Sequence, residues 1–338
     1  MVKKALVSLL LCGMTMRLAV MAGAEEGIRR WVDALEAAET AVETYTEAAV
    51  ISSGERALVG DVLTVPVEFS GESGETAHSY GENYGTEIVE ATFKSDISIR
   101  NDTSFGIDLE ELASEPLGLK MPAEGPQVLI IHTHGSEAYT QAGSDFYEES
   151  DPYRTEDKSK SVIKVGDVLT NVLTEKGLRV IHDREIYDYP SYTGSYSRSG
   201  AAVEAYLAEY PGIAVVIDLH RDALGSGDTV YKTRAETEKG ECAQVMLLVG
   251  TGENGLSHPN WKQNLLLGLY LQNAMEEAYP TLARPLALKS ERYNQHLSTG
   301  SLIIEVGSTG NTLAEAIAAI ELFGNAAGDA LVKLIDNE

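Results

Sequence analysis

Apolar runs and helical periods alternate from residue 128 to the end of the chain. Unbroken apolar runs are typical of strands buried on both faces of a sheet. The expected strands are, in order, VLIIH, LRVIH, IAVVIDLH, VMLLVG and SLIIEVG. One expected helix starts at Val162 and stops at Gly177, and the others span residues 201–210, 261–278 and 312–334. This order predicts an α/β domain over residues 125–338, with a mostly parallel sheet flanked by helices.

The residues before this domain have a different pattern. Residues 26–49 have a helical period, residues 57–69 alternate like a strand, and residues 70–85 are rich in Gly, Ser and Glu without any period. Residues 91–105 alternate again, and a short helix is expected over residues 108–117. We therefore expect a stalk and a small mixed α+β accessory region over residues 25–124, ending at MPAEGP.

The first 24 residues resemble an export signal. Two lysines precede an apolar run, which Arg17 interrupts, and Ala22 and Ala24 form an A-x-A-like cleavage site. The run predicts a signal peptide or membrane anchor over residues 1–24, and thus a secreted or membrane-anchored protein outside the cytoplasm. If the leader is removed, Cys242 is the only cysteine, so no intramolecular disulfide can form. We interpret Cys242 as an incidental thiol.

The chain is strongly acidic. Its 338 residues have a formal net charge of −26. Binding to the phosphate backbone requires a cationic surface, so this charge argues against nucleic acid as a partner.

Three expected strands end in residues that can do chemistry. VLIIH ends in His132, with His134 just beyond it, IAVVIDLH ends in Asp218 and His220, and SLIIEVG contains Glu305. Ligands of open α/β sheets bind beyond the carboxyl ends of the strands. We therefore expect the three ends to lie at one edge of the sheet.

This combination of residues favours a catalytic zinc ion, which takes three protein ligands and leaves a position for water. The candidate ligands are His132 or His134, together with Glu137 and His220, and Glu305 is the candidate base. Residues two apart on a strand point the same way. Both His132 and His134 could therefore face the metal if the strand continues, whereas a turn after His132 would leave only one.

Other residues have candidate supporting roles. Asp218 could accept a hydrogen bond from a metal-binding imidazole. Arg221 is expected to form a local ion pair with Asp222 rather than clamp a substrate. The loop YDYPSYTGSYSRS contains Tyr192 and Tyr196, which could form one wall of a substrate groove.

The remaining candidates are weaker. His296 lies upstream of the Glu305 strand and could reach over the site, whereas His182 and His258 are interpreted as structural. Ser136 suggests a serine nucleophile, but GSEA lacks the second glycine of the G-x-S-x-G elbow.

Several motifs in this order resemble the stage II sporulation protein P family. They are VLIIHTHGSEAYT, YDYPSYTGSYSRS, VVIDLHRDA and TGSLIIEVGSTGNTLAEA, preceded by SDISIRNDTSFGIDLEEL. The resemblance runs from about Phe93 to the C-terminus. It implies a zinc-dependent peptidoglycan hydrolase similar to N-acetylmuramoyl-L-alanine amidases, with possible action on peptide cross-links. It also implies work at the sporulation septum with a lytic transglycosylase, the stage II sporulation protein D, and a membrane protein, the stage II sporulation protein M.

The resemblance assigns roles to particular residues. His220 matches the later metal-binding histidine of the zinc amidases, and Glu305 matches their catalytic glutamate. The histidine after the first strand is either His132 or His134. The chain departs from the amidases at the metal-binding glutamate, which they carry on the first helix. Here that helix begins SKSVIKVG, with no acid on its apolar face, and Glu137 is the nearest substitute.

Two alternatives to the zinc amidase come from other functional classes. One is a wall-binding or scaffold protein on the same fold with a degenerate site. The other is an esterase that uses Ser136 as its nucleophile.

Overall fold

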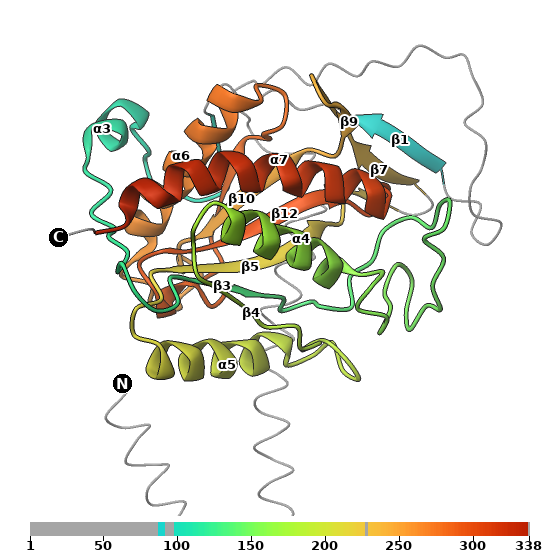
Figure 1. Cartoon of the computed structure of the whole chain (residues 1–338), viewed down its shortest axis with the longest axis horizontal. Coiled ribbons are helices and arrows are strands. Elements are labelled where there is room, and N and C mark those ends of the chain that lie inside the picture. The colour runs from blue at the N-terminus through green and yellow to red at the C-terminus, as the bar shows by residue number, and fades with distance from the viewer. Residues whose placement is uncertain (1–86, 92–97, 227–228, 337–338) are drawn as a thin grey trace, which may run out of the picture. The chain divides into compact units, whose positions relative to one another are not determined.

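The computed structural model describes residues 87–91, 98–226 and 229–336 (Figure 1). The expected leader over residues 1–24, the helix over 26–49, the strand over 57–69 and the linker over 70–85 lie outside these ranges. Within them, no helix combines the length and the apolar character that a membrane crossing requires.

A seven-stranded sheet lies at the centre of the described region. Its strands are β2 (Ile99–Asn101), β3 (Val128–Ile131), β4 (Val180–His182), β5 (Val215–Asp222), β10 (Val245–Gly250), β11 (Leu286–Lys289) and β12 (Ser301–Ser308). Their order across the sheet is β2-β11-β10-β12-β5-β3-β4. Only β10 and β12 pair antiparallel, and all other neighbours are parallel. The sheet confirms the predicted α/β class.

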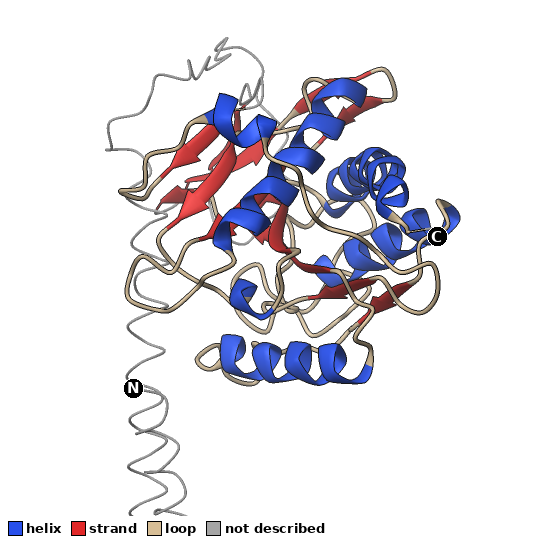
Figure 2. Ribbon diagram, turned by 90° about the vertical axis from the view of Figure 1, so that its left-hand side faces the viewer, coloured by secondary structure: helices blue, strands red, loops and turns tan. Residues whose placement is uncertain are grey.

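Helices cover both faces of this sheet (Figures 1 and 2). They are α3 (Leu109–Ser114), α4 (Val162–Glu175), α5 (Ser195–Glu209), α6 (Trp261–Ala278) and α7 (Leu313–Leu331). Helices α4, α6 and α7 share one large apolar cluster with the sheet, and α5 packs on the opposite face. The sheet is therefore the middle layer of three.

The apolar run of β3 shows why the strand sequences are unbroken. Val128 and Ile130 pack into the cluster with α4 and α7, whereas Leu129 and Ile131 pack against α5. Successive side chains of a strand point to opposite faces. Because both faces are covered by helices, every position of the strand is apolar and buried.

The helices begin and end at local signals. The Ser161 side chain accepts a hydrogen bond from the Ile163 amide at the start of α4, and the helix stops before Gly177, whose φ is +99°. Thr312 and Glu315 form a capping box at the start of α7. Helix α5 starts at Ser195, six residues before the expected position 201. The sequence pattern missed its first turns because they are polar and lack an apolar period.

The sequence patterns did not predict the strands between β5 and β10. These are β6 (Gly225–Ser226), β7 (Thr229–Thr233), β8 (Ala235–Thr237) and β9 (Gly240–Cys242), and β7 pairs with β1 (Glu87–Ala91). They are too short to develop a clear period. From the expected accessory region, β2 joins the main sheet beside β11. The domain boundary near Gly125 stays a prediction.

Phe323 of α7 tests the contribution of this core. Its side chain is 0% exposed, and we expect Phe323→Ala to lower the free energy of unfolding by about 3–5 kcal/mol through lost contacts and a cavity. Phe146, which is 62% exposed, is the matched control, and Phe146→Ala should change stability by less than about 0.5 kcal/mol. Urea unfolding followed by circular dichroism measures both. Equal losses for the two variants would contradict the assigned core.

Candidate active site

The carboxyl ends of β3, β5 and β12 lie side by side, as the sequence predicted. The three strands are parallel neighbours, with Ile131 paired to Asp218 and His220 paired to Glu305. Paired residues of neighbouring strands place their side chains on the same face. The register therefore sets Glu305 beside His220 at this edge.

His132 points into the protein. Its Nδ1 atom lies 2.8 Å from the carbonyl oxygen of Leu219, and its Nε2 atom lies 2.8 Å from Nε2 of His182. The Nδ1 atom of His182 is 3.3 Å from a carboxylate oxygen of Asp167. Burial and the neighbouring His182 together lower the pKa of His132 to about 3. Both ring nitrogens of His132 are thus engaged with protein atoms.

Gly166 of α4 makes room for this histidine pair. A Cβ atom at position 166 would come within 2.6 Å of Nε2 of both His132 and His182. That spacing is too short for any side chain. The helix face next to the site is therefore filled by imidazole rings from β3 and β4.

His134 lies apart from His132, because β3 ends at Ile131 and a turn follows. Its ring stacks on the ring of Tyr192, with the two centroids 4.5 Å apart. The Tyr192 hydroxyl lies 3.1 Å from the Nε2 atom of His134. The ring of Tyr196 contacts it edge-on at 5.5 Å. Its Nδ1 atom is buried and has no hydrogen-bond partner among the described residues. Burial lowers the pKa of His134 to about 3, so the ring is neutral near pH 7.

His220 lies between two carboxylates. Its Nδ1 atom is 3.4 Å from Oε2 of Glu137, and its Nε2 atom is 2.9 Å from Oδ1 of Asp218. Burial disfavours the charged ring, but Asp218 and Glu137 together raise the pKa of His220 well above its usual range. The ring centroid of His134 is 5.2 Å away. The structure thus brings His134, Glu137 and His220 together.

The pKa values of Glu137 and Glu305 shift in opposite directions. Burial raises the pKa of Glu137, but the hydrogen bond with His220 and the charge of Arg221 outweigh it and hold that pKa well below the usual range. Burial, Asp222 and Glu137 raise the pKa of Glu305 to about 8, although His220 lowers it in part. The Oε2 atom of Glu305 is buried and has no hydrogen-bond partner among the described residues. Glu137 is therefore ionised near pH 7, and Glu305 can hold or release a proton.

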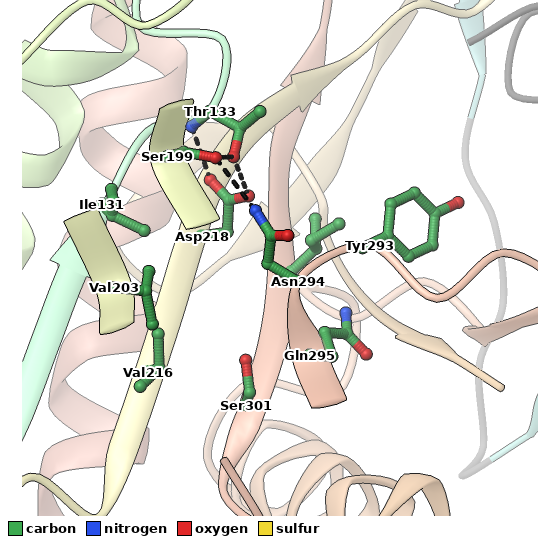
Figure 3. A pocket seen from close by; sticks show the side chains of 11 residues that line it. Ile131, Thr133, Ser199, Val203, Val216, Asp218, Tyr293, Asn294, Gln295 and Ser301 are labelled. Carbon is green, nitrogen blue, oxygen red and sulfur yellow. Dashed lines mark hydrogen bonds between the residues drawn. The ribbon is translucent and has the colours of Figure 1, made fainter. Parts of the chain in front are cut away.

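A hydroxyl network fixes Asp218. It accepts hydrogen bonds from the Thr133 amide at 2.8 Å and from the Thr133 hydroxyl at 2.6 Å. The hydroxyl of Ser199 lies 2.7 Å from that of Thr133, and Asn294 donates to Ser199 at 3.0 Å. Figure 3 shows this network at one end of a small pocket, with Tyr293 on the far side. Asp218 is thus held in place beside His220.

Arg221 does not pair with Asp222, so that expectation is wrong. Its Nε atom donates to the carbonyl of Ala138 at 2.7 Å, whereas the Asp222 carboxylate pairs with Arg284 at 2.8 Å. The two neighbours point to opposite faces because they are adjacent on β5. Arg221 fastens the loop after β3 to the sheet.

The other candidate histidine lies elsewhere. His296 is in the 3₁₀ turn Gln295–Leu297, with its ring 6.5 Å from that of His258. None of the hydrogen bonds or ring contacts found in the described part of the chain joins it to His134, Glu137 or His220.

Cys242 is buried, and burial raises the pKa of its thiol to about 11.

Sequence reasoning missed Arg154 and Asp188. Arg154 contacts Glu137, Ser136 and Asp188, and Asp188 lies 3.9 Å from Nδ1 of His134. Both residues come from irregular loops with no period. Asp188 lies in the motif YDYPSYTGSYSRS, but nothing in that motif indicates its partner. The two loops meet Glu137 only in the folded chain, so the linear sequence carries no signal for these contacts.

The donor set fits a metal chemically, although it is not arranged as a cage. Within the described ranges, no three His, Cys, Asp or Glu side chains have the spacing of a metal site. Two neutral or ionisable imidazoles and an ionised carboxylate are nevertheless the ligands that zinc takes in catalytic sites. The unpartnered, buried Nδ1 atom of His134 is the observation that favours a metal-binding role for this ring.

The fold and the site define an α/β protein with imidazoles and carboxylates gathered at the carboxyl edge of its sheet. The family model of stage II sporulation protein P (SpoIIP) matches residues 67–327, and the chain belongs to this family. Stage II sporulation protein P of Bacillus subtilis (strain 168) is 29% identical over 213 residues, 60% of this chain and 49% of that protein. The chain thus spans about half the length of this curated relative.

Solved structures of amidases are also similar to the chain. The amidase AmiC2 of Nostoc punctiforme matches with a TM-score of 0.34 and 11% identity, over 62% of this chain and 97% of its own. The amidase Ami1 of Mycobacterium smegmatis matches with a TM-score of 0.37 and 11% identity, over 63% and 98%.

The raised pKa of Glu305 predicts a pH-dependent stability. The folded protein ionises this group at about 8, whereas the unfolded chain does so near the usual 4.5, so unfolding releases a proton between these pH values. Stability from this group therefore falls as pH rises through that window. For metal-free protein, we compare the free energy of unfolding of Glu305→Gln with that of wild type. The difference between the two should shift in favour of the variant by up to about 4 kcal/mol between pH 4.5 and pH 8.5.

Denaturant unfolding at several pH values in the presence of a chelator measures this difference. A stability difference between Glu305→Gln and wild type that stays constant from pH 4.5 to 8.5 would show that the folded-state pKa is not raised.

Proposed function

We propose that the protein is a zinc-dependent peptidoglycan hydrolase that cleaves the N-acetylmuramoyl-L-alanine amide. The observation that carries the proposal is the meeting of His134, Glu137 and His220 beside Glu305, in a chain of the stage II sporulation protein P family. Peptide cross-links of the wall are a second class of amide that the same chemistry would cut.

The metal ligands in this proposal are His134, Glu137 and His220. His132 is left out because Leu219 and His182 engage its two ring nitrogens. Asp218 holds the far side of the His220 ring and sets which nitrogen is free. In the same way, the Tyr192 hydroxyl at Nε2 of His134 leaves Nδ1 available.

The reaction would use Glu305 for proton transfer. When bound, zinc polarises the scissile carbonyl and the attacking water. Glu305 takes a proton from that water and passes it to the leaving amine, a task that suits a carboxyl whose pKa lies near 8. Tyr192 and Tyr196 border His134 and offer flat, hydroxyl-bearing surfaces for the glycopeptide.

The cellular setting in the proposal follows from family membership. The protein would act outside the cytoplasm, at the sporulation septum, on the wall that is thinned during engulfment. Stage II sporulation proteins D and M would be its lytic transglycosylase and membrane partners. The leader expected over residues 1–24 supports export.

Zinc content and activity on purified sacculi test the proposal together. Wild type should carry about one zinc per chain. It should release stem peptides with new L-alanine amino termini and leave peptide-free glycan, both detected by mass spectrometry. Glu305→Gln should keep the zinc and lose activity by about 10²–10⁴-fold, because only proton transfer is removed. His134→Ala should lose both.

Glu321→Gln is the matched control, since Glu321 is exposed on α7, and it should behave as wild type. Wild type without stoichiometric zinc, and Glu305→Gln with unchanged activity, would overturn the hydrolase and favour a wall-binding protein. Inactivation by a serine-directed reagent but not by a chelator would favour an esterase. Ser136 argues against that outcome, because its buried hydroxyl donates to Asp188 rather than to a histidine.

A further inference from the structure

Arg154 lies directly opposite Glu137 in a short antiparallel contact between two loops. The amide of Ala138 donates to the Tyr153 carbonyl at 2.9 Å, and the amide of Thr155 donates to the Ser136 carbonyl at 2.8 Å. Glu137 and Arg154 are the bridge partners between these bonds. Directly opposed residues place their side chains on the same side. The backbone therefore aims Arg154 at Glu137.

The guanidinium of Arg154 contacts two carboxylates at once. Its Nη2 atom lies 3.6 Å from Oε1 of Glu137, and its Nη1 atom pairs with Asp188 and donates to the Ser136 hydroxyl at 3.1 Å. The other oxygen of Glu137, Oε2, accepts from the Arg221 amide at 3.2 Å and faces His220. Arg154 thus occupies one oxygen of Glu137 and leaves the other facing His220.

Asp188 is a competing carboxylate. One of its oxygens is 3.9 Å from Nδ1 of His134, the unpartnered nitrogen. In the structure, Ser136 and Arg154 hold this carboxylate. Without the guanidinium, a buried carboxylate would lose its cation and would gain most from pairing with His134 or a metal ion.

Arg154 also supports the ring that holds His134. Its guanidinium carbon lies 4.8 Å from the centre of the Tyr192 ring, whose other contacts include the stacked imidazole of His134. Such a cation–π contact fixes the plane of the tyrosine. Both an imidazole and a carboxylate of the proposed ligand set therefore depend on one side chain.

We propose that Arg154 is a positioning residue, which turns Glu137 toward His220 and keeps Asp188 from replacing it as a ligand at His134. The inference rests on the proposed function, since it concerns the same metal site. Arg154 is 18% exposed at its side chain and touches no reacting atom, so its effect is on which carboxylate binds the metal.

Metal affinity and Co²⁺ spectra test this role without an activity assay. We expect Arg154→Met to bind Zn²⁺ about 10–100-fold more weakly than wild type in competition with a chromophoric chelator, as for other residues that orient metal ligands. The visible band of bound Co²⁺ should also change, because Asp188 joins the ligand set. Adding Asp188→Asn to Arg154→Met should restore the wild-type Co²⁺ band.

Arg198→Met is the matched control. Arg198 binds the carbonyls of Tyr187, Ser191 and Thr193 and so holds the same loop as Asp188 and Tyr192, without any contact to Glu137. It should bind Zn²⁺ within about threefold of wild type. An equal loss in both arginine variants would mean that loop order alone matters, and would overturn the inference.

The outcomes separate the inference from the proposed function. Wild type that takes up no stoichiometric zinc overturns both. Wild type that binds zinc, with an Arg154→Met variant of equal affinity and equal Co²⁺ spectrum, overturns the inference alone. If Arg154→Met does not fold, Arg154→Lys decides, because lysine can pair with Asp188 but lacks the fork to hold Glu137 as well. Its Zn²⁺ affinity should fall severalfold, and an unchanged affinity contradicts the role.

Discussion

The parallel pairing of β3, β5 and β12 is the constraint on which the site depends. Three strands that run the same way end at one edge of the sheet, and their register opposes His220 to Glu305 and Asp218 to Ile131. A shift of one residue would turn either side chain to the other face. Such a shift would exchange the residues packed against α4 and α7 with those packed against α5, and so would disrupt the packing on both faces of the sheet. The chemistry at the edge is therefore fixed by packing far from it.

Several charged carboxylates lie buried at this edge of the sheet, although burial by itself disfavours the charged form. Three buried carboxylates each have two partners. Asp218 contacts Thr133 and His220, and Glu137 contacts Arg221 and Arg154. Asp188 contacts Ser136 and Arg154. Glu305 lacks such a partner at Oε2, and burial together with the charges of Asp222 and Glu137 raises its pKa. Local departures from the rule that buried polar groups are satisfied are typical of functional sites.

The sequence was sufficient for the parts of this site that sit on regular elements. His220, Asp218 and Glu305 lie on the apolar strands β5 and β12, and the alternation of strands and helices predicts a parallel sheet whose strands end at one edge. The separation of His134 from His132 depends on the turn after Ile131, which no local pattern indicates. Arg154 and Asp188 are separated from each other by 34 positions and lie in loops. Their contacts depend on tertiary packing, so propensity and period cannot predict them.

The histidine pair His132 and His182 occupies the space between α4 and the edge of the sheet. Helix α4 presents Gly166 at this point, and any side chain there would collide with His132 and His182. The space next to the sheet edge is already filled by imidazoles that fasten β3 to β4 and to β5. The turn after β3 places the carboxylate of Glu137 on the other side of this edge, with Oε2 3.4 Å from Nδ1 of His220. A side chain on a turn is held less firmly than one on a helix, and the ion pair with Arg154 adds support for Glu137.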